Sequence, residues 1–246
     1  MFETLSAIAL TIAASIVVAF LSQALARTAP ERLTVAGVLG AWFVLVVAVG
    51  AAGVLNPGNG AGVPGLGLTV ALPVVALTGA FFAFLSIRGA MLAIPLPALV
   101  AVNAIRVLGV IFVTLYAAGR LPAPFAPSAG WGDIFAGVTA LLVAWAMIRL
   151  GSRVWPLVLL WNAIGLADLV SAVGLGALSA PGSFQVFAGP PTSAMMTTLP
   201  WLIIPGFLVP SLMFIHIVIF YRLAKKEAAA PGRSWLGGAE RGSISV

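Results

Sequence analysis

Seven long apolar segments, separated by short linkers, dominate the pattern of hydrophobic and polar positions along the chain. A helix needs about 20 apolar residues to cross the hydrocarbon core of a bilayer, and each segment is close to that length. The pattern therefore predicts an all-α fold, a polytopic transmembrane helix bundle within residues 1–226. The expected spans are residues 5–26, 33–55, 66–86, 98–118, 131–150, 154–178 and 199–221.

The composition is that of a membrane protein. Of the 246 residues, 62% are hydrophobic and 7% are charged, whereas soluble domains carry about 25% charged residues. The sequence has no cysteine, which excludes disulfides and thiolate metal sites, and its single histidine excludes a bis-histidine haem within one chain. We expect no cofactor and no metal site.

The basic residues fall on alternate linkers. Lys and Arg occur in the first, third and fifth linkers and in the tail, whereas the second and sixth linkers have none and the fourth has only Arg120. The positive-inside rule therefore places the N-terminus outside the cell and the C-terminus in the cytoplasm. The net charge of +6 reflects this topology, so we expect the lipid bilayer as a partner and no nucleic acid. We expect residues 227–246 to form a disordered, basic cytoplasmic tail.

The first span has a competing interpretation as a signal peptide, because Ala24-Leu25-Ala26 resembles a signal-peptidase site. However, no basic residue precedes the segment, and its apolar run is longer than that of a signal peptide. We therefore expect a helix that is retained.

The last span carries a proline every five residues, at Pro200, Pro205 and Pro210. Pro200 fits the start of a helix, whereas an interior proline removes a backbone donor and disturbs the preceding turn. We expect kinks at Pro205 and Pro210. Two interpretations remain open, a broken helix that lines a cavity and a bend that packing requires.

Four ionisable residues lie inside the predicted spans, where an Arg or Asp at the centre costs about 2.5–3.5 kcal/mol. At a rise of about 1.5 Å per residue, Arg106 lies about 12 Å and Asp168 about 21 Å from the inner face. Each charge alone in hydrocarbon is unfavourable, so we expect Arg106 and Asp168 to pair directly or through water. The pair has two interpretations, a site for a solute, ion or proton, and an ion pair that only sets helix register.

Further polar residues surround this pair. Asn103 shares a helix face with Arg106, and Asn162 lies at a similar depth. A hydrogen-bonded packing role is favoured over a ligand role for His216. Asp133 opens the fifth span, where a carboxylate favours the helix N-terminus, and we expect it to be hydrated near the outer surface. The candidate ligand or proton site comprises Arg106, Asp168, Asn162, Asn103, His216 and Asp133, and no catalytic residue is assigned.

Two features of the sequence bear on chemistry. Gly130-Trp131-Gly132-Asp133 matches the GxGD string of presenilin-like and prepilin-peptidase aspartyl proteases, which need two carboxylates sharing a proton. In those families the partner Asp precedes the string, whereas here Asp168 follows it, so the protease is disfavoured. A retinal Schiff base of the microbial-rhodopsin kind does not fit, because the last span has no lysine.

Five stretches in the last four spans carry a resemblance to known proteins. They are Arg106-x-x-Gly109-x-x-Phe112, Gly119-x-Leu121-Pro122-x-x-Phe125-Ala126, Ala129-Gly130-x-Gly132-Asp133, Trp161-Asn162-x-x-Gly165-x-x-Asp168-Leu169, and Leu199-Pro200 to Pro210 with His216. Together they resemble a group of uncharacterised bacterial polytopic integral membrane proteins. The resemblance implies a bacterial cytoplasmic (inner) membrane and adds weight to the polar residues above, but it implies no activity.

The sequence favours a protein that handles a small solute, ion or lipid through an intramembrane polar site. The alternative is a structural or assembly subunit that contacts other membrane subunits. A membrane enzyme that acts on a lipid-soluble substrate, with Asp133 or Asp168 as acid or base, is less favoured.

Overall fold

The computed structural model describes residues 1–26, 28–58 and 62–225. Within these residues the chain is all-α, as predicted, and contains no strand. The tail expected at residues 227–246 lies outside the described part of the chain. The α-helices are α1 (Phe2–Leu25), α2 (Ala29–Ala51), α3 (Gly62–Ala83), α4 (Leu85–Ala93), α5 (Leu96–Ala101), α6 (Val110–Ala117), α7 (Phe125–Leu150), α8 (Trp155–Leu178) and α9 (Val209–Ala224).

Four short segments of other helical types interrupt or join these helices. Three are 3₁₀-helices, of which η1 separates α5 from α6, η2 joins α7 to α8, and η3 lies in the connection after α8. The fourth, η4, is a π-helical turn that leads directly into α9. Their bounds are η1 (Val102–Gly109), η2 (Gly151–Val154), η3 (Ser193–Thr197) and η4 (Ile204–Leu208).

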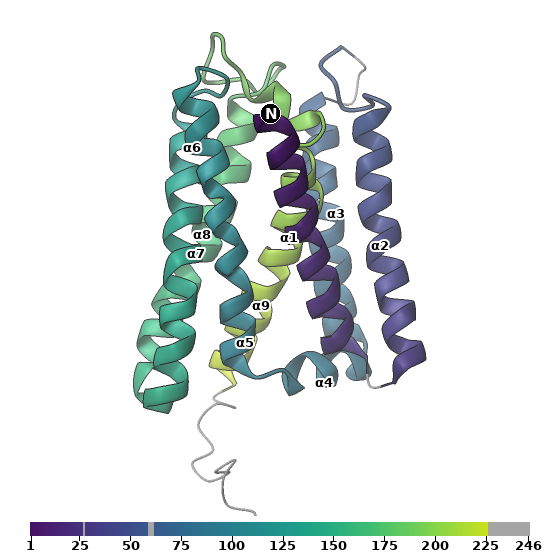
Figure 1. The fold of residues 1–246 in the computed structure, drawn as a ribbon, viewed down its shortest axis with the longest axis vertical. Coiled ribbons are helices and arrows are strands. Elements are labelled where there is room, and N and C mark those ends of the chain that lie inside the picture. Colours follow the sequence, from purple (N-terminus) through teal and green to yellow (C-terminus); the bar gives the residue numbers. More distant parts are fainter. Residues whose placement is uncertain (27, 59–61, 226–246) are drawn as a thin grey trace, which may run out of the picture.

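Six helical stretches of the described chain are long and apolar enough to cross a membrane, so the chain is a multi-pass membrane protein. One of them, residues 125–178, is 54 residues long and folds back on itself at η2, where Gly151 has a φ of +60°. A glycine adopts this backbone conformation without the steric penalty of a side chain. The stretch therefore holds two adjacent long helices, α7 and α8, and the six stretches contain the seven predicted helices (Figure 1).

The helices begin and end where proline and capping residues direct them. The fifth predicted span begins at Phe125 rather than at residue 131, because Pro127 falls in the first turn, where a helix needs no backbone donor. The second begins at Ala29, where Thr28 and Glu31 form a capping box. The third predicted span, residues 66–86, ends at Ala83 in the structure. The chain then enters α4, which was not predicted as a separate helix.

Helix α4 lies across one end of the bundle, at a steep angle to the long helices (Figure 1). It buries Ala90 and Met91 against the bundle and leaves Leu85 exposed. An amphipathic helix in this position suits the interface between the hydrocarbon core and the headgroups.

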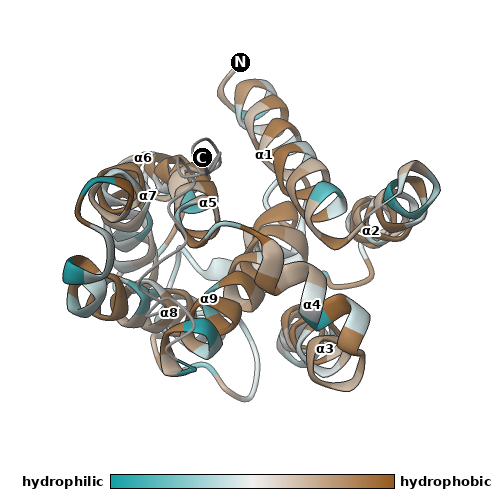
Figure 2. Ribbon diagram, turned by 90° about the horizontal axis from the view of Figure 1, so that it is seen from below, coloured by the Kyte–Doolittle hydropathy of each residue, from teal (hydrophilic) through white to brown (hydrophobic). Residues whose placement is uncertain are grey.

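The centre of the bundle is the irregular helix made of η4 and α9. It is the most buried of the candidate spans, whereas α2 and α3 are among the least buried. Figure 2, viewed along the bundle, shows α9 among the other helices and α2 at the edge. In the central helix the Phe207 side chain is fully buried. The centroid of its ring lies 4.5 Å from that of Trp42 and 5.5 Å from that of Phe43.

The central helix is irregular because one proline lies within the π-turn and a second follows it. Pro205 and Pro210 have no N–H to donate, so the regular pattern of backbone hydrogen bonds cannot continue through them. The chain instead forms η4, after which the N–H of Val209 donates to the carbonyl of Ile204. The sequence predicts kinks at these two prolines, and the structure has a π-turn at Pro205 and the first turn of α9 at Pro210.

We expect Phe207→Ala to lower the free energy of unfolding by about 3–5 kcal/mol, because it removes the ring that packs between the central helix and α2 and leaves a cavity. Phe135→Ala is the matched control, because this ring is 50% exposed on α7 and its loss should change stability by about 0.5 kcal/mol or less. Unfolding in mixed micelles, followed by circular dichroism, measures both. Equal losses for the two variants would contradict the central role of this helix.

Candidate functional site

Arg106 lies in η1, a 3₁₀ segment in the middle of a membrane-spanning stretch. A 3₁₀-helix has three residues per turn, so Asn103, Arg106 and Gly109 line up on one face. All three are buried. A 3₁₀ stretch within a helix often marks a functional or strained position, and here it directs the arginine toward α7, α8 and α9.

The guanidinium of Arg106 donates hydrogen bonds to three neighbouring helices. Its Nε donates to Asp133 Oδ1 at 2.7 Å on α7, and its Nη2 donates to Asp168 Oδ2 at 2.5 Å on α8. Its Nη1 donates to the carbonyl of Gly165 at 3.0 Å and lies 3.2 Å from His216 Nε2 on α9. The arginine side chain is 1% exposed. The predicted pair of Arg106 and Asp168 is therefore confirmed.

The expectation for Asp133 was wrong. The sequence predicts that this residue is hydrated and lies near the outer surface, at the start of the fifth span. Because α7 starts at Phe125, Asp133 lies about two turns inside the helix. Its side chain is 15% exposed and forms an ion pair with Arg106.

His216 is a hydrogen-bonded residue of the network, fully buried beside the Trp161 ring at a centroid distance of 5.6 Å. Arginine can only donate, so His216 Nε2 accepts from Arg106 and carries no proton. His216 Nδ1 then donates to Asn162 Oδ1 at 2.7 Å, and Asn162 Nδ2 donates to the His216 carbonyl at 3.1 Å. The imidazole is neutral in this arrangement, and Asn162 holds it in one tautomer.

Asn103 shares the face of Arg106 but bonds within its own segment. Its side-chain Nδ2 donates to the carbonyl of Leu99 at 3.0 Å, where α5 passes into η1. Its Oδ1 is buried and has no hydrogen-bond donor among the described residues. The described part of the chain therefore leaves this buried acceptor unsatisfied.

Glycines around the network make room for it, and the sequence prediction did not assign them this role. A Cβ at Gly132 would lie 1.7 Å from Asp168 Oδ1, and one at Gly165 would lie 2.7 Å from His216 Cε1. A Cβ at Gly137 would lie 2.5 Å from the backbone nitrogen of Val107 in η1. Small residues at close helix crossings are the signal that points to such positions.

The network is rich in acceptors and in negative charge. Two carboxylates bind adjacent nitrogens of one guanidinium, and the histidine is neutral, so the formal charge is −1 when both aspartates are ionised. The second oxygens, Asp133 Oδ2 and Asp168 Oδ1, receive no hydrogen bond from the described residues. A cavity of about 30 Å³ adjoins Arg106 and Asp133. It has room for about two water molecules.

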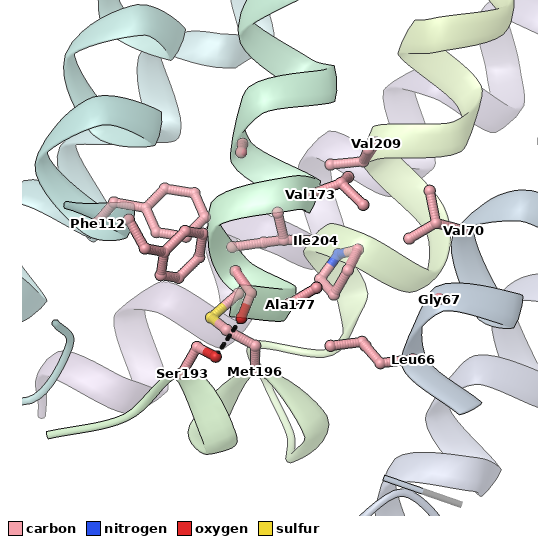
Figure 3. Close-up of a pocket in the computed structure, with 14 residues that line it drawn as sticks. Leu66, Gly67, Val70, Phe112, Val173, Ala177, Ser193, Met196, Ile204 and Val209 are labelled. Carbon is pink, nitrogen blue, oxygen red and sulfur yellow. Dashed lines mark hydrogen bonds between the residues drawn. The ribbon is translucent and has the colours of Figure 1, made fainter. Parts of the chain in front are cut away.

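Figure 3 shows a second, apolar pocket of about 60 Å³. The two share Phe112, Ile204 and Val209 as lining residues. Pro205 also lines the pocket, so the irregular helix borders a cavity at this proline. The only hydrogen bond drawn within it runs from Ser193 Oγ to the carbonyl of Gly176 at 2.6 Å (Figure 3).

The geometry bears on two kinds of chemistry. Within the described residues, no group of three His, Cys, Asp or Glu side chains converges as metal ligands. The GxGD carboxylate, Asp133, and Asp168 are both held by the guanidinium of Arg106. An aspartyl protease instead needs two carboxylates that share a proton and activate a water, and this arrangement gives that chemistry no support.

A comparison with protein families found one match, to a family described as Domain of unknown function (DUF8737), over residues 63–224. The match covers well over half of the chain, so the chain belongs to this family, and every residue of the network lies within it. Comparisons with curated proteins and with solved structures found no match.

We expect Gly132→Ala to destabilise the protein, because its methyl group would displace the Asp168 carboxylate from Arg106. Gly174→Ala on α8 is the control, because nothing lies within 4 Å of its Cβ position. A helical Gly→Ala change by itself stabilises by about 1 kcal/mol, so the two variants should shift the melting temperature in opposite directions. A rise for both variants would show that the carboxylate position is not constrained.

Proposed function

We propose that this member of the DUF8737 family handles a small solute, ion or lipid at the Arg106–Asp133–Asp168 cluster, which holds one exchangeable cation, in the simplest case a proton. One observation carries the proposal. Two carboxylates share a single guanidinium inside the membrane-spanning bundle, beside a neutral histidine. Ionisable groups inside a membrane protein mark ion and solute pathways by default.

The cluster is expected to bind a cation because it has one carboxylate more than Arg106 can neutralise. An uncompensated charge in a low-dielectric interior is unfavourable by several kcal/mol, and Arg106 can neutralise only one of the two aspartates. A proton or another cation on the second carboxylate restores neutrality. In this role Arg106 positions both carboxylates, Asp133 faces the small cavity, and His216 with Asn162 holds the other side of the guanidinium.

A second candidate is a structural or assembly subunit, and it also has an observation in its favour. The single side chain of Arg106 forms hydrogen bonds from η1 to α7, α8 and α9, as expected of a polar group that fixes helix register. A membrane enzyme remains the least favoured, because both candidate carboxylates are already bound to the arginine.

We place the N-terminus outside and the C-terminus in the cytoplasm, in a bacterial inner membrane. The basic residues of the described chain support the orientation, because most lie at the end of the bundle that carries α4, opposite the N-terminus (Figure 1). The positive-inside rule assigns that end to the cytoplasm. These residues are Arg32, Arg88, Arg149, Arg153, Arg222 and Lys225.

The absence of cysteine from the sequence allows a direct test of orientation. Ser183→Cys and Ser152→Cys place one exposed thiol near opposite ends of the bundle. In intact cells, a membrane-impermeant maleimide should label Cys only in the Ser183 variant, and the Ser152 variant should react only after permeabilisation. The reverse pattern would invert the proposed topology.

Asp133→Asn and Asp168→Asn each remove the surplus negative charge, so we expect either variant to abolish the exchangeable proton while the fold persists. Infrared spectroscopy of the protein in lipid, titrated with pH, should show a buried protonated carboxyl band in the wild type and no such band in either variant. Glu3→Gln is the matched control, because Glu3 pairs with Arg120 on the exposed surface, and it should leave the band unchanged.

The proposal would be contradicted if infrared spectra of the wild-type protein showed neither a buried protonated carboxyl band nor a shift of the carboxylate bands with added Na⁺ or K⁺. The structural candidate predicts a different result. Replacing Arg106, Asp133 and Asp168 together by Leu would then leave a stable protein, whereas Arg106→Leu alone should cost about 3–5 kcal/mol, because it strands two buried carboxylates.

A further inference from the structure

The apolar pocket of Figure 3 adjoins the small cavity at Arg106 and Asp133, and the two spaces together suit a ligand with two chemically different parts. The pocket is lined almost entirely by hydrocarbon, which comes from α3, α6, α7, α8, η3 and the central helix. Phe112, Ile204 and Val209 line both this pocket and the cavity at Arg106 and Asp133, so the two spaces adjoin. A small molecule that occupies both spaces needs one apolar end and one polar end.

The polar end of that ligand is a cation. Arg106 already donates to Asp133, Asp168, Gly165 and His216 and is almost fully buried, so it offers little to an anion. Asp133 lines the cavity, and its second oxygen, an acceptor, receives no hydrogen bond from the described residues. Acceptors with a surplus negative charge select a positively charged hydrogen-bond donor such as an ammonium group.

The size of the two spaces limits the ligand. The pocket of about 60 Å³ and the cavity of about 30 Å³ hold about six water-sized groups together. A primary amine with about five carbons has this number of non-hydrogen atoms.

Entry from the bilayer fits the position of the pocket. Its lining comes from α3 on one side and α8 on the other, and these two helices contact each other far less than each contacts the central helix. Irregular backbone at membrane depth, such as η4, occurs where it is covered by protein or lines a cavity. Pro205 of η4 lines this pocket.

We propose that the exchangeable cation of the cluster is a small lipophilic amine, whose ammonium group binds at Asp133 and whose hydrocarbon part lies in the apolar pocket. This inference rests on the proposed function and narrows it to one class of ligand. The ammonium takes the place of the exchangeable proton, so its binding releases one proton.

The test uses pentylamine with the full-length protein in lipid nanodiscs, followed by isothermal titration calorimetry in two buffers of different ionisation enthalpy. We expect saturable binding with release of about one proton, and no comparable binding of pentanol, which has the same size and no charge. Asp133→Asn should weaken binding tenfold or more. Thermal unfolding checks that each variant is folded.

Two variants of α8 test the position of the hydrocarbon part. Ala177→Leu fills the apolar pocket and leaves the cluster intact, so it should weaken pentylamine binding tenfold or more and keep the protonated carboxyl band. Gly174→Leu adds a larger side chain three residues earlier, in open space, and should bind like the wild type. Ala172→Leu, also in the pocket lining, serves in place of Ala177→Leu if that variant does not fold.

The outcomes separate this inference from the proposed function. Binding of pentanol as tight as that of pentylamine, wild-type affinity in Asp133→Asn, or wild-type affinity in both pocket variants would overturn the amine site. If pentylamine does not bind and the carboxyl band persists, the amine is wrong and the proton site stands. If the band is also absent from the wild type, both proposals fail.

Discussion

The buried guanidinium of Arg106 is the constraint on which the rest of the structure depends. A cation in a membrane interior is tolerated only when its donors are satisfied within the protein, and this one takes partners from α7, α8 and α9. The 3₁₀ form of η1 directs the side chain toward those helices. Glycines at the crossings let their backbones approach closely enough, as at Gly132 and Gly165. Replacing any of these features would leave a charge without its partner.

The central helix supplies the second requirement of a site, which is space. Side chains in a protein interior normally fill it to the density of an organic crystal, so a cavity needs a local reason. Here Pro205 within η4 and Pro210 just after it interrupt the regular helix, and residues of this turn line both the apolar pocket and the polar cavity. The same irregular segment therefore borders both parts of the proposed ligand site, which links the charge of the network to a place where a ligand can bind.

Much of this arrangement was predictable from local patterns, because lipid imposes strong and simple rules on length and charge. The apolar runs predicted the seven helices, the prolines predicted the interruption before α9, and the cost of isolated charges predicted the pairing of Arg106 with Asp168. Asp133 was misplaced, because a proline-rich segment that looks like a loop also makes a good first helical turn. Helix α4 was missed, because nine residues are too few for a span.

The sequence by itself determined that the chain is an all-α membrane protein, that its basic residues concentrate on alternate linkers, and that Arg106 needs a carboxylate inside the bilayer. These conclusions follow from composition and spacing, which are local properties. Only the tertiary structure decided that two carboxylates converge on that arginine, that His216 accepts one of its hydrogen bonds, and that an apolar pocket adjoins them. Such details depend on which helices pack together and in what rotation, and short-range sequence patterns do not encode them.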